Sequence, residues 1–131
     1  MKKYLLDTNI ISYYLKGIEN FKEKISGNIH LLSISIISYY EIVSGLQSID
    51  ANRRIAEFET FCELIDIINL DKASISASCN IYANLKKSGW LIDDMDILIA
   101  GIALSGNLIM VTDNTWHFER IEGLKVENWK N

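Results

Sequence analysis

The acidic residue Asp7 directly follows a short apolar run at residues 4–6. This run does not alternate with polar residues, so it predicts a strand covered on both faces, as in the middle of a parallel sheet. Thr8 and Asn9 come next, and both residue types commonly begin helices. We therefore expect Asp7 at the carboxyl end of a central strand, where open α/β sheets bind ligands. Capping of the following helix is its alternative role.

A similar oxygen-rich turn follows a second apolar run, residues 108–111, where the chain continues as Thr112, Asp113 and Asn114. Because the carboxyl ends of parallel strands meet at one edge of the sheet, the two turns are expected to lie close together.

Two further carboxylates fall within predicted helices. Glu41 shares a helix face with small and apolar side chains, so it is either half-exposed at a cleft or held by a partner, since an unpaired buried charge is costly. Asp96 leads into the apolar run 97–104 and is expected about one turn inside the helix that contains this run. Capping would explain Asp93 or Asp94, whereas the position of Asp96 favours a metal or active-site role.

The predicted sheet allows these acidic and amide side chains to meet at one rim. Several carboxylates within a few ångströms of one another cannot all stay ionised unless a cation joins them. Ligands that are all oxygen favour a hard ion, Mg²⁺ or Mn²⁺, over zinc. The candidate ligands are Asp7, Glu41, Asp96, Asp113 and Asn114.

The elements that must position these side chains alternate along the chain. Strands are predicted near residues 2–6, 29–35, 65–70 and 108–111, with an edge strand at 124–127. Helices are predicted at 10–15, 19–26, 37–46, 51–64, 71–87 and 97–104, with one helical turn at 116–120. This order predicts a parallel sheet with helices on both faces.

Two of these helices carry more specific expectations. The charged helix at 19–26 is expected to face solvent. The helix at 71–87 is expected to begin at a capping Asp71, to end at Gly89, and to bury one stripe of side chains. That stripe is Ile75, Cys79, Tyr82 and Leu85.

Length and composition fit one ordinary domain spanning residues 1–131, with 49% hydrophobic and 23% charged residues. No apolar run approaches the roughly 20 residues of a membrane span, and the N-terminus lacks a signal-peptide pattern, so we expect a cytoplasmic protein with no membrane contact. The net charge of −4 has the wrong sign for unaided binding to nucleic acid, so cations would have to bridge the acidic site to phosphate.

Four motifs in this order resemble the PIN-domain ribonucleases, specifically the VapC-type toxins of bacterial toxin–antitoxin pairs. The motifs are Leu5-Leu6-Asp7-Thr8-Asn9, Ser38-Tyr39-Tyr40-Glu41-Ile42, Gly89-x-x-Ile92-x-x-x-Asp96-x-x-Ile99-Ala100 and Val111-Thr112-Asp113-Asn114-x-x-x-Phe118. The resemblance spans essentially the whole chain and implies a three-layer α/β/α PIN-like domain with a central parallel sheet.

By position, Asp7, Glu41 and Asp96 match the acidic residues that bind metal in this family. Asn114 stands where many members have a fourth Asp, so Asp113 beside it either compensates or the site has only water-mediated metal contacts there. The resemblance assigns the polar residues around the site as pocket-shaping or supporting groups: Thr8, Asn9, Asp94 and Thr112.

The activity that the resemblance implies is Mg²⁺- or Mn²⁺-dependent cleavage of RNA by an activated water, leaving 5′-phosphate and 3′-hydroxyl ends. It also implies a homodimer and a cognate antitoxin whose segment fills a groove beside the carboxylates.

Rival classes share an acidic magnesium pocket. A non-catalytic phospho-receiver domain would use Asp71 as phosphoacceptor, but it needs paired acids after the first strand and a lysine after the last, and this chain has neither. A phosphatase of the haloacid type needs a second Asp two residues after Asp7, where Asn9 stands. A PIN fold kept only for binding stays open because of Asn114.

Overall fold

A parallel five-stranded sheet lies at the centre of the computed structural model, which describes residues 2–130. The strand order is β3-β2-β1-β4-β5, so the predicted central position of the first strand is confirmed. The strands are β1 (Tyr4–Leu6), β2 (Leu32–Ser35), β3 (Asp66–Ile68), β4 (Ile109–Val111) and β5 (Val126–Glu127). Leu6 of β1 pairs with Val111 of β4, which brings the residues after both strands to the same edge.

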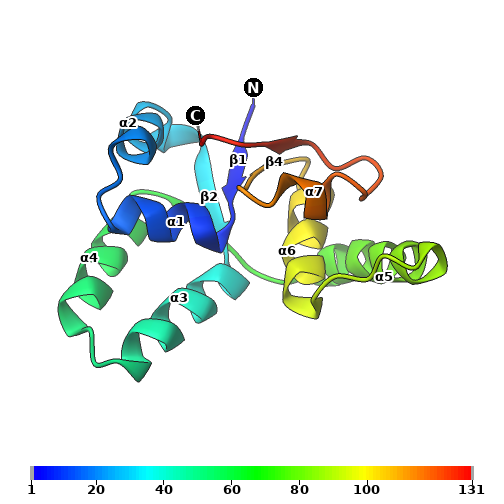
Figure 1. The fold of residues 1–131 in the computed structure, drawn as a ribbon, viewed down its shortest axis with the longest axis horizontal. Helices are drawn as coiled ribbons and strands as arrows, with labels where there is room; N and C mark the ends of the chain where they lie inside the picture. Colours follow the sequence, from blue (N-terminus) through cyan, green and yellow to red (C-terminus); the bar gives the residue numbers. More distant parts are fainter. Residues whose placement is uncertain (1, 131) are drawn as a thin grey trace.

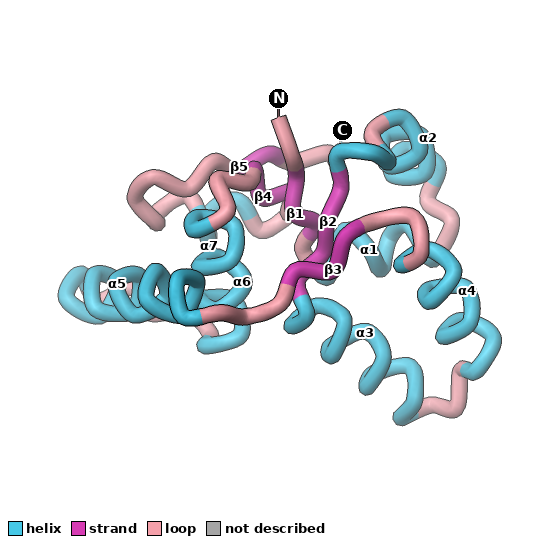
Figure 2. The backbone as a smooth tube through the Cα atoms, turned by 180° about the vertical axis from the view of Figure 1, so that it is seen from behind, coloured by secondary structure: helices cyan, strands magenta, loops and turns pink. Residues whose placement is uncertain are grey.

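Helices cover both faces of this sheet and give the predicted three layers. The helical elements are α1 (Thr8–Leu15), α2 (Glu19–Gly27), the 3-10 turn η1 (Ile29–Leu31), α3 (Ile36–Ser48), α4 (Asn52–Cys62), α5 (Lys72–Ser88), α6 (Asp94–Ser105) and α7 (Thr115–Phe118). α1 to α4 lie on one side of the strands and α5 to α7 on the other (Figures 1 and 2). Successive side chains of β1 therefore face opposite layers. Leu5 packs into the core under α5 and α6, and Leu6 packs into the core under α1 to α4.

Near residue 29 the structure differs from two sequence expectations. The predicted strand at 29–35 begins only at Leu32, because the chain first makes the turn η1, with Leu31 N donating to Asn28 O at 2.8 Å. The preceding helix α2 does not simply face solvent, since Phe21 and Ile25 are buried and the Phe21 ring stacks on Tyr13 with centroids 5.0 Å apart. Its charged residues occupy only the outer face.

The inward face of α5 is also different from the predicted one. Ser74, Ser78, Ile81 and Leu85 are the buried residues of α5, whereas Ile75, Cys79 and Tyr82 of the predicted stripe are exposed and only Leu85 was correctly assigned.

A close helix approach explains this choice. A Cβ added to Gly101 of α6 would lie 1.9 Å from Ser78 Oγ and 2.7 Å from Ser74 O, so only small residues fit on both helices. Ser78 Oγ donates to Ile97 O at 3.1 Å, which satisfies the buried hydroxyl. The face of α5 that is buried is therefore set by the small side chains that allow α5 and α6 to approach closely, and not by the spacing of its apolar residues.

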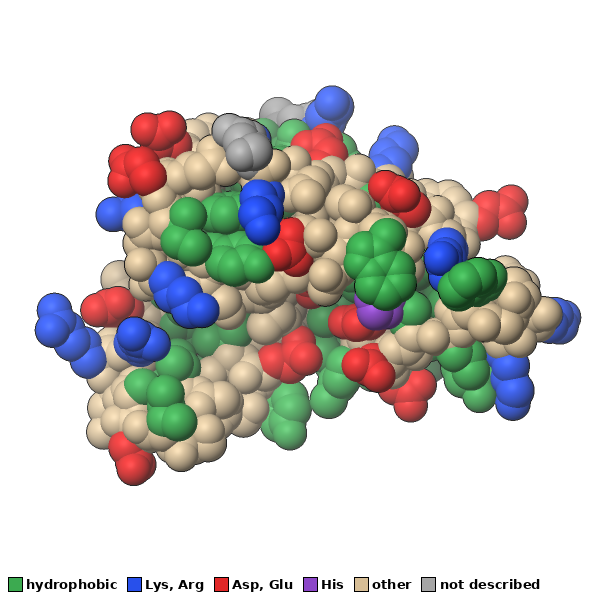
Figure 3. Space-filling model, in the orientation of Figure 1, with side chains coloured by type: hydrophobic (Ala, Val, Ile, Leu, Met, Phe, Trp, Pro, Cys, Tyr) green, Lys and Arg blue, Asp and Glu red, His purple; other side chains and the backbone are tan. Residues whose placement is uncertain are grey.

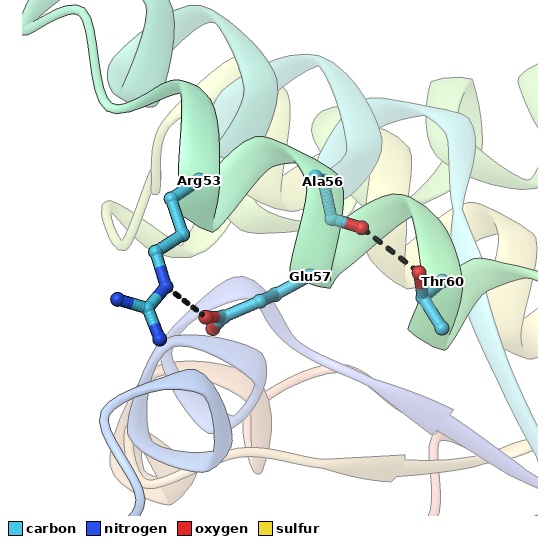
Figure 4. A network of polar contacts seen from close by, with 4 residues as sticks. All are labelled: Arg53, Ala56, Glu57 and Thr60. Atoms are coloured by element: carbon cyan, nitrogen blue, oxygen red, sulfur yellow. Dashed lines mark hydrogen bonds and ion pairs between the residues drawn. The ribbon is translucent and has the colours of Figure 1, made fainter.

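The predicted amphipathic helix α4 is confirmed. Its buried side includes Phe58, while on its outer side Arg53 Nε lies 3.5 Å from Glu57 Oε1 and Thr60 Oγ1 donates to Ala56 O (Figure 4). An exposed i,i+4 ion pair contributes only about 0.3–0.5 kcal/mol, so the buried aromatic face is what stabilises α4.

Within residues 2–130, no helix has the length and hydropathy that crossing a bilayer requires. The cytoplasmic location expected from the sequence stays a prediction.

Candidate active site

Asp7 lies buried at the carboxyl edge of the sheet, with only 5% of its surface exposed. Its backbone N donates to Val111 O at 2.9 Å, which ties the end of β1 to β4. Its carboxylate accepts a hydrogen bond from Thr8 N at 2.8 Å and another from Thr112 Oγ1 at 2.8 Å. Asp7 therefore both caps α1 and stands at the predicted ligand-binding edge.

A cleft of about 420 Å³ opens beside Asp7. The structure brings Glu41 of α3, Asp96 of α6 and Asn114 to this cleft together with Asp7, although they are far apart in the sequence. Acidic side chains gather in the middle of the face drawn in Figure 3. The remaining lining residues come from α1 and the residue that follows it: Thr8, Asn9, Ser12, Tyr13 and Lys16.

The carboxylates of the cleft repel one another. Burial raises the pKa of Asp7 to about 6, hydrogen bonds from Thr112 and Thr8 oppose the rise, and the charges of Asp96 and Glu41 add to it. Burial likewise raises the pKa of Asp96, with His117 opposing and Glu41 adding.

No ion pair neutralises these three carboxylates within the part of the chain that the structure describes. Desolvated like charges without a counter-ion are a feature of functional sites, and a bound cation would stabilise them.

Glu41 is half-buried and is held by α1. Thr8 Oγ1 donates to Glu41 Oε1 at 2.6 Å, and the Ser38 hydroxyl oxygen lies 3.0 Å from the same Oγ1. Ser35 Oγ accepts from Ser38 N at 3.0 Å, so Ser35 caps α3. The two alternatives for Glu41 are both realised, because it borders the cleft and also has a hydrogen-bonding partner.

The two candidate ligands in the turn after β4 lie in different surroundings. The Asp113 carboxylate accepts hydrogen bonds from Asn9 Nδ2 and from Tyr13 OH, and Asp113 is not among the residues lining the cleft. Asn114 does line it, and its backbone N donates to Thr112 Oγ1 at 3.0 Å. Asn114 is therefore the group of this turn that borders the cleft, while Asp113 positions side chains of α1.

The two acidic residues at the start of α6, Asp93 and Asp94, also differ in their surroundings. Asp94, assigned by resemblance as a supporting group, lines a groove between α5 and α6 with Ile75 and Tyr82 and does not line the cleft. Asp93 is the neighbour whose charge raises the pKa of Asp96. Asp93 occupies the N-cap position of α6, but its side chain makes no capping hydrogen bond.

Three residues of the cleft were not predicted: Ser12, Tyr13 and Lys16. Ser12 and Lys16 lie four and eight residues after the predicted Thr8, and this spacing was a signal available in the sequence, because residues four apart share a helix face. His117 is near enough to Asp96 to affect its pKa. No feature of the sequence pointed to that proximity.

The residues present fit a hard divalent cation in the type of donor they offer. The cleft presents carboxylate and amide oxygens, and Asn9 Oδ1 is a buried acceptor without a hydrogen bond to the described residues. Among residues 2–130, no three His, Cys, Asp or Glu side chains lie close enough to enclose an ion by themselves. An ion held by Asp7 and Asp96 would therefore take further oxygens from Asn114 or water.

The phospho-receiver alternative is not supported by the position of its key residue. Asp71 caps α5, accepting from Ser74 N at 2.8 Å, and Ser74 Oγ lies 3.0 Å from Asp71 N to complete a capping box. Asp71 follows β3, an edge strand of the sheet, and does not line the acidic cleft.

A family model for the PIN domain matches residues 4–124, nearly the whole chain. Together with the parallel three-layer fold and the acidic cleft at the strand ends, this match makes the chain a PIN-domain protein.

Individual relatives narrow the class. The chain is 34% identical to the tRNA(fMet)-specific endonuclease VapC of Shigella flexneri, over 98% of this chain and 99% of the relative. It is 35% identical to ribonuclease VapC2 of Haemophilus influenzae over the same shares. The chain of a DNA-bound VapBC structure from Salmonella typhimurium superposes with a TM-score of 0.92 at 32% identity, over 99% of this chain and 100% of that one. The chain therefore belongs to the VapC ribonucleases of the PIN-domain family.

Proposed function

We propose that this chain is a Mg²⁺- or Mn²⁺-dependent endoribonuclease and the toxin of a toxin–antitoxin pair. The observation that carries the proposal is the buried Asp7 carboxylate, which shares a cleft with Asp96 and Glu41 and has no cationic side chain paired with it in the described chain. The names of the relatives support the nuclease activity.

In this proposal each side chain of the cleft has a defined task. A bound divalent ion would supply positive charge for the phosphate and a water acidic enough to attack it at neutral pH. Thr112 Oγ1 and Thr8 N hold the Asp7 carboxylate in one orientation. Thr8 Oγ1 does the same for Glu41. Asp7 and Asp96 would be the principal ligands, with Glu41 and Asn114 in support.

The proposed substrate is RNA, cut to leave 5′-phosphate and 3′-hydroxyl ends. Transfer RNA is the substrate to test first, because relatives from Shigella flexneri and Salmonella typhimurium are named tRNA(fMet)-specific endonucleases. The substrate's phosphates would approach an acidic cleft, so binding would depend on the same cations as catalysis.

The proposed protein partner is an antitoxin, as in the VapBC structures that the chain resembles. A largely apolar groove of about 200 Å³ between α1, α3 and α4 would receive its segment, with Leu15, Ile42 and Leu46 among the lining residues. Thr8 and Glu41 line both this groove and the cleft, so an occupant of the groove would reach the catalytic carboxylates.

Self-association is proposed as well. The exposed stripe of α5 and the adjoining side of α6 form an apolar groove of about 360 Å³, lined by residues that include Ile75, Tyr82 and Leu98. Exposed apolar surface of this kind is typical of interfaces, and it supports the homodimer that the family resemblance implies.

The test is RNA cleavage by the purified chain in Mg²⁺, in Mn²⁺ and in EDTA. We expect cleavage only with a divalent ion, and loss of cleavage in Asp96→Asn with an unchanged circular dichroism spectrum. Asp66→Asn, at the exposed start of β3 and away from the cleft, is the matched control and should cleave normally. Undiminished cleavage in EDTA would contradict the proposal, and RNA binding without cleavage in any metal would favour a PIN fold retained for binding.

A further inference from the structure

Two of the three tryptophans are exposed on the α7 side of the molecule. Trp116 is 59% and Trp90 54% exposed, whereas Trp129 is 6% exposed and belongs to the core. On the face drawn in Figure 3, hydrophobic side chains lie beside a histidine and beside basic and acidic side chains. Large exposed aromatic rings near a catalytic cleft commonly mark a binding surface.

Each exposed ring is packed against a group behind it. The rings of Trp116 and His117 have centroids 4.7 Å apart and are tilted by 31°. The guanidinium carbon of Arg120 lies 3.5 Å from the centroid of the Trp90 ring. These contacts restrict the rings while most of their surface stays open, so a ligand that stacks on them would lose little side-chain entropy.

Trp116 lies two residues after Asn114, which lines the cleft, and Trp90 is connected to the same segment through Arg120. α7 begins directly after Asn114, which lines the cleft, and His117 of α7 is near enough to lower the pKa of Asp96. Trp116 lies in α7 and Arg120 lies two residues after its end. The guanidinium of Arg120 in turn packs on the ring of Trp90. A path of ring and cationic groups therefore runs outward from the acidic cleft.

We propose that Trp116 and Trp90 form a stacking platform for the nucleobases of single-stranded RNA next to the phosphate that is cut. The proposal rests on the ribonuclease function for the identity of its ligand. Aromatic rings stack on any base, and a guanidinium that already stacks on a ring can still donate its N–H groups to a phosphate. Arg120 would thus contact the RNA backbone between the two bases.

The groups that contact the two rings favour RNA over a protein ligand at this surface. Arg120 and His117 back the rings with groups that complement phosphates and bases, whereas the groove between α1, α3 and α4 offers the apolar lining that suits a protein segment. The acidic cleft repels phosphate unless cations are present, so uncharged stacking beside it would add affinity that the cleft alone lacks.

The test measures binding directly, through the quenching of tryptophan fluorescence by short oligoadenylate in Ca²⁺. Trp116→Ala and Trp90→Ala should each weaken binding by roughly tenfold, and Trp116→Phe should restore most of it. An abasic strand of the same length should bind the natural chain more weakly than oligoadenylate does, and this difference should shrink in Trp116→Ala and vanish in Trp90→Ala/Trp116→Ala. Leu64→Ala removes a similarly exposed side chain, 63% exposed and two residues beyond the end of α4, and should leave RNA binding unchanged.

Two results would overturn the platform. One is an unchanged affinity in both alanine variants, and the other is weakened antitoxin binding with RNA binding intact, which would make the surface a protein interface. Folding is checked with Trp90→Phe/Trp116→Phe, whose remaining fluorescence comes from the buried Trp129 and should be unaffected by RNA.

The platform and the nuclease proposal fail in different ways. If the natural chain cleaves no RNA in any metal, the nuclease proposal fails, while the quenching measurement still tests the platform. If the natural chain cleaves RNA and Trp116→Ala keeps the same KM, the platform fails and the nuclease stands. A stacking role predicts a KM that rises severalfold with a smaller change in kcat, which a merely structural residue would not produce.

Discussion

The turns after β1 and β4 have similar sequences and different roles. Leu6 pairs with Val111, so Asp7 and Thr112 occupy equivalent positions, and Thr112 donates to the Asp7 carboxylate. Asp113 stands one position later and turns to Asn9 and Tyr13 on α1. The carboxylate that directly follows β1 therefore borders the cleft, whereas the carboxylate two residues after β4 is held by side chains of α1.

The largest difference between the two turns is expected when the aspartate of each is replaced with asparagine. Asp7→Asn removes a proposed metal ligand, and we expect RNA cleavage to fall on the order of 10³-fold or more. Asp113→Asn should keep cleavage within roughly fivefold and lower the free energy of unfolding by about 1 kcal/mol, because the bonds from Asn9 and Tyr13 lose their charged acceptor. Single-turnover rates and thermal unfolding measure both effects. Equal losses of activity would contradict the division of roles.

In EDTA, the pH dependence of the free energy of unfolding should also distinguish Asp7 from an ordinary aspartate. Its pKa is about 6 in the folded chain against 3.8 for an ordinary Asp, so the folded state favours the protonated form. The resulting stabilisation is full below about pH 4 and is lost as the pH rises through about 6, with a total on the order of 3 kcal/mol.

Urea unfolding of the natural chain and of Asp7→Asn across this range gives the difference curve, since other carboxylates titrate in both proteins. The free energy of unfolding of Asp7→Asn, relative to that of the natural chain, should rise between pH 4 and 6. This difference should become smaller when Mg²⁺ is added. A flat difference curve would show that Asp7 is not destabilised by its burial.

The hydroxyl at the position equivalent to Asp7 can be tested by Thr112→Val, which keeps the side-chain shape. The buried Asp7 carboxylate would lose the donor on its Oδ2, so we expect an activity loss of roughly tenfold and a stability loss of about 1–3 kcal/mol. Thr112→Ser, which keeps the donor, should retain most of both. Wild-type activity in Thr112→Val would mean that the orientation of Asp7 does not depend on this bond.

The smallest effect is expected at Asp94. Family resemblance gives it a supporting role, whereas it lines the α5–α6 groove, so Asp94→Asn should cleave RNA within about twofold of the natural rate. Asp93→Asn, which removes a charge that acts on Asp96, is the comparison and should lower the pKa of Asp96. A large loss in Asp94→Asn would restore the role that the resemblance assigns.

Much of the fold was predictable because its signals are local. The continuous apolar run at 108–111 marks a strand covered on both faces, Asp71 and Ser74 form a capping box, and Gly89 ends α5 with a φ of +78°. Three site residues, Asp7, Glu41 and Asp96, were predicted to converge, and they do border one cleft.

The errors arose where a local pattern allows two answers. α5 carries apolar residues on both sides, so periodicity alone did not select the stripe through Ser78, which is buried because Gly101 approaches it. Residues 29–31 are apolar and β-branched in part, yet the turn closed by Asn28 makes them a 3-10 helix.

The sequence by itself determined which segments form strands and in what order they follow along the chain, and it determined both ends of α5 at Asp71 and Gly89, since each of these features depends on neighbouring residues. Only the tertiary structure decided that Asn114 and not Asp113 borders the cleft, that Asp94 lies outside it, and that His117 stands near Asp96. Those outcomes depend on how α1, α6 and α7 pack against the ends of β1 and β4, and such contacts between distant segments leave no periodic trace in the chain.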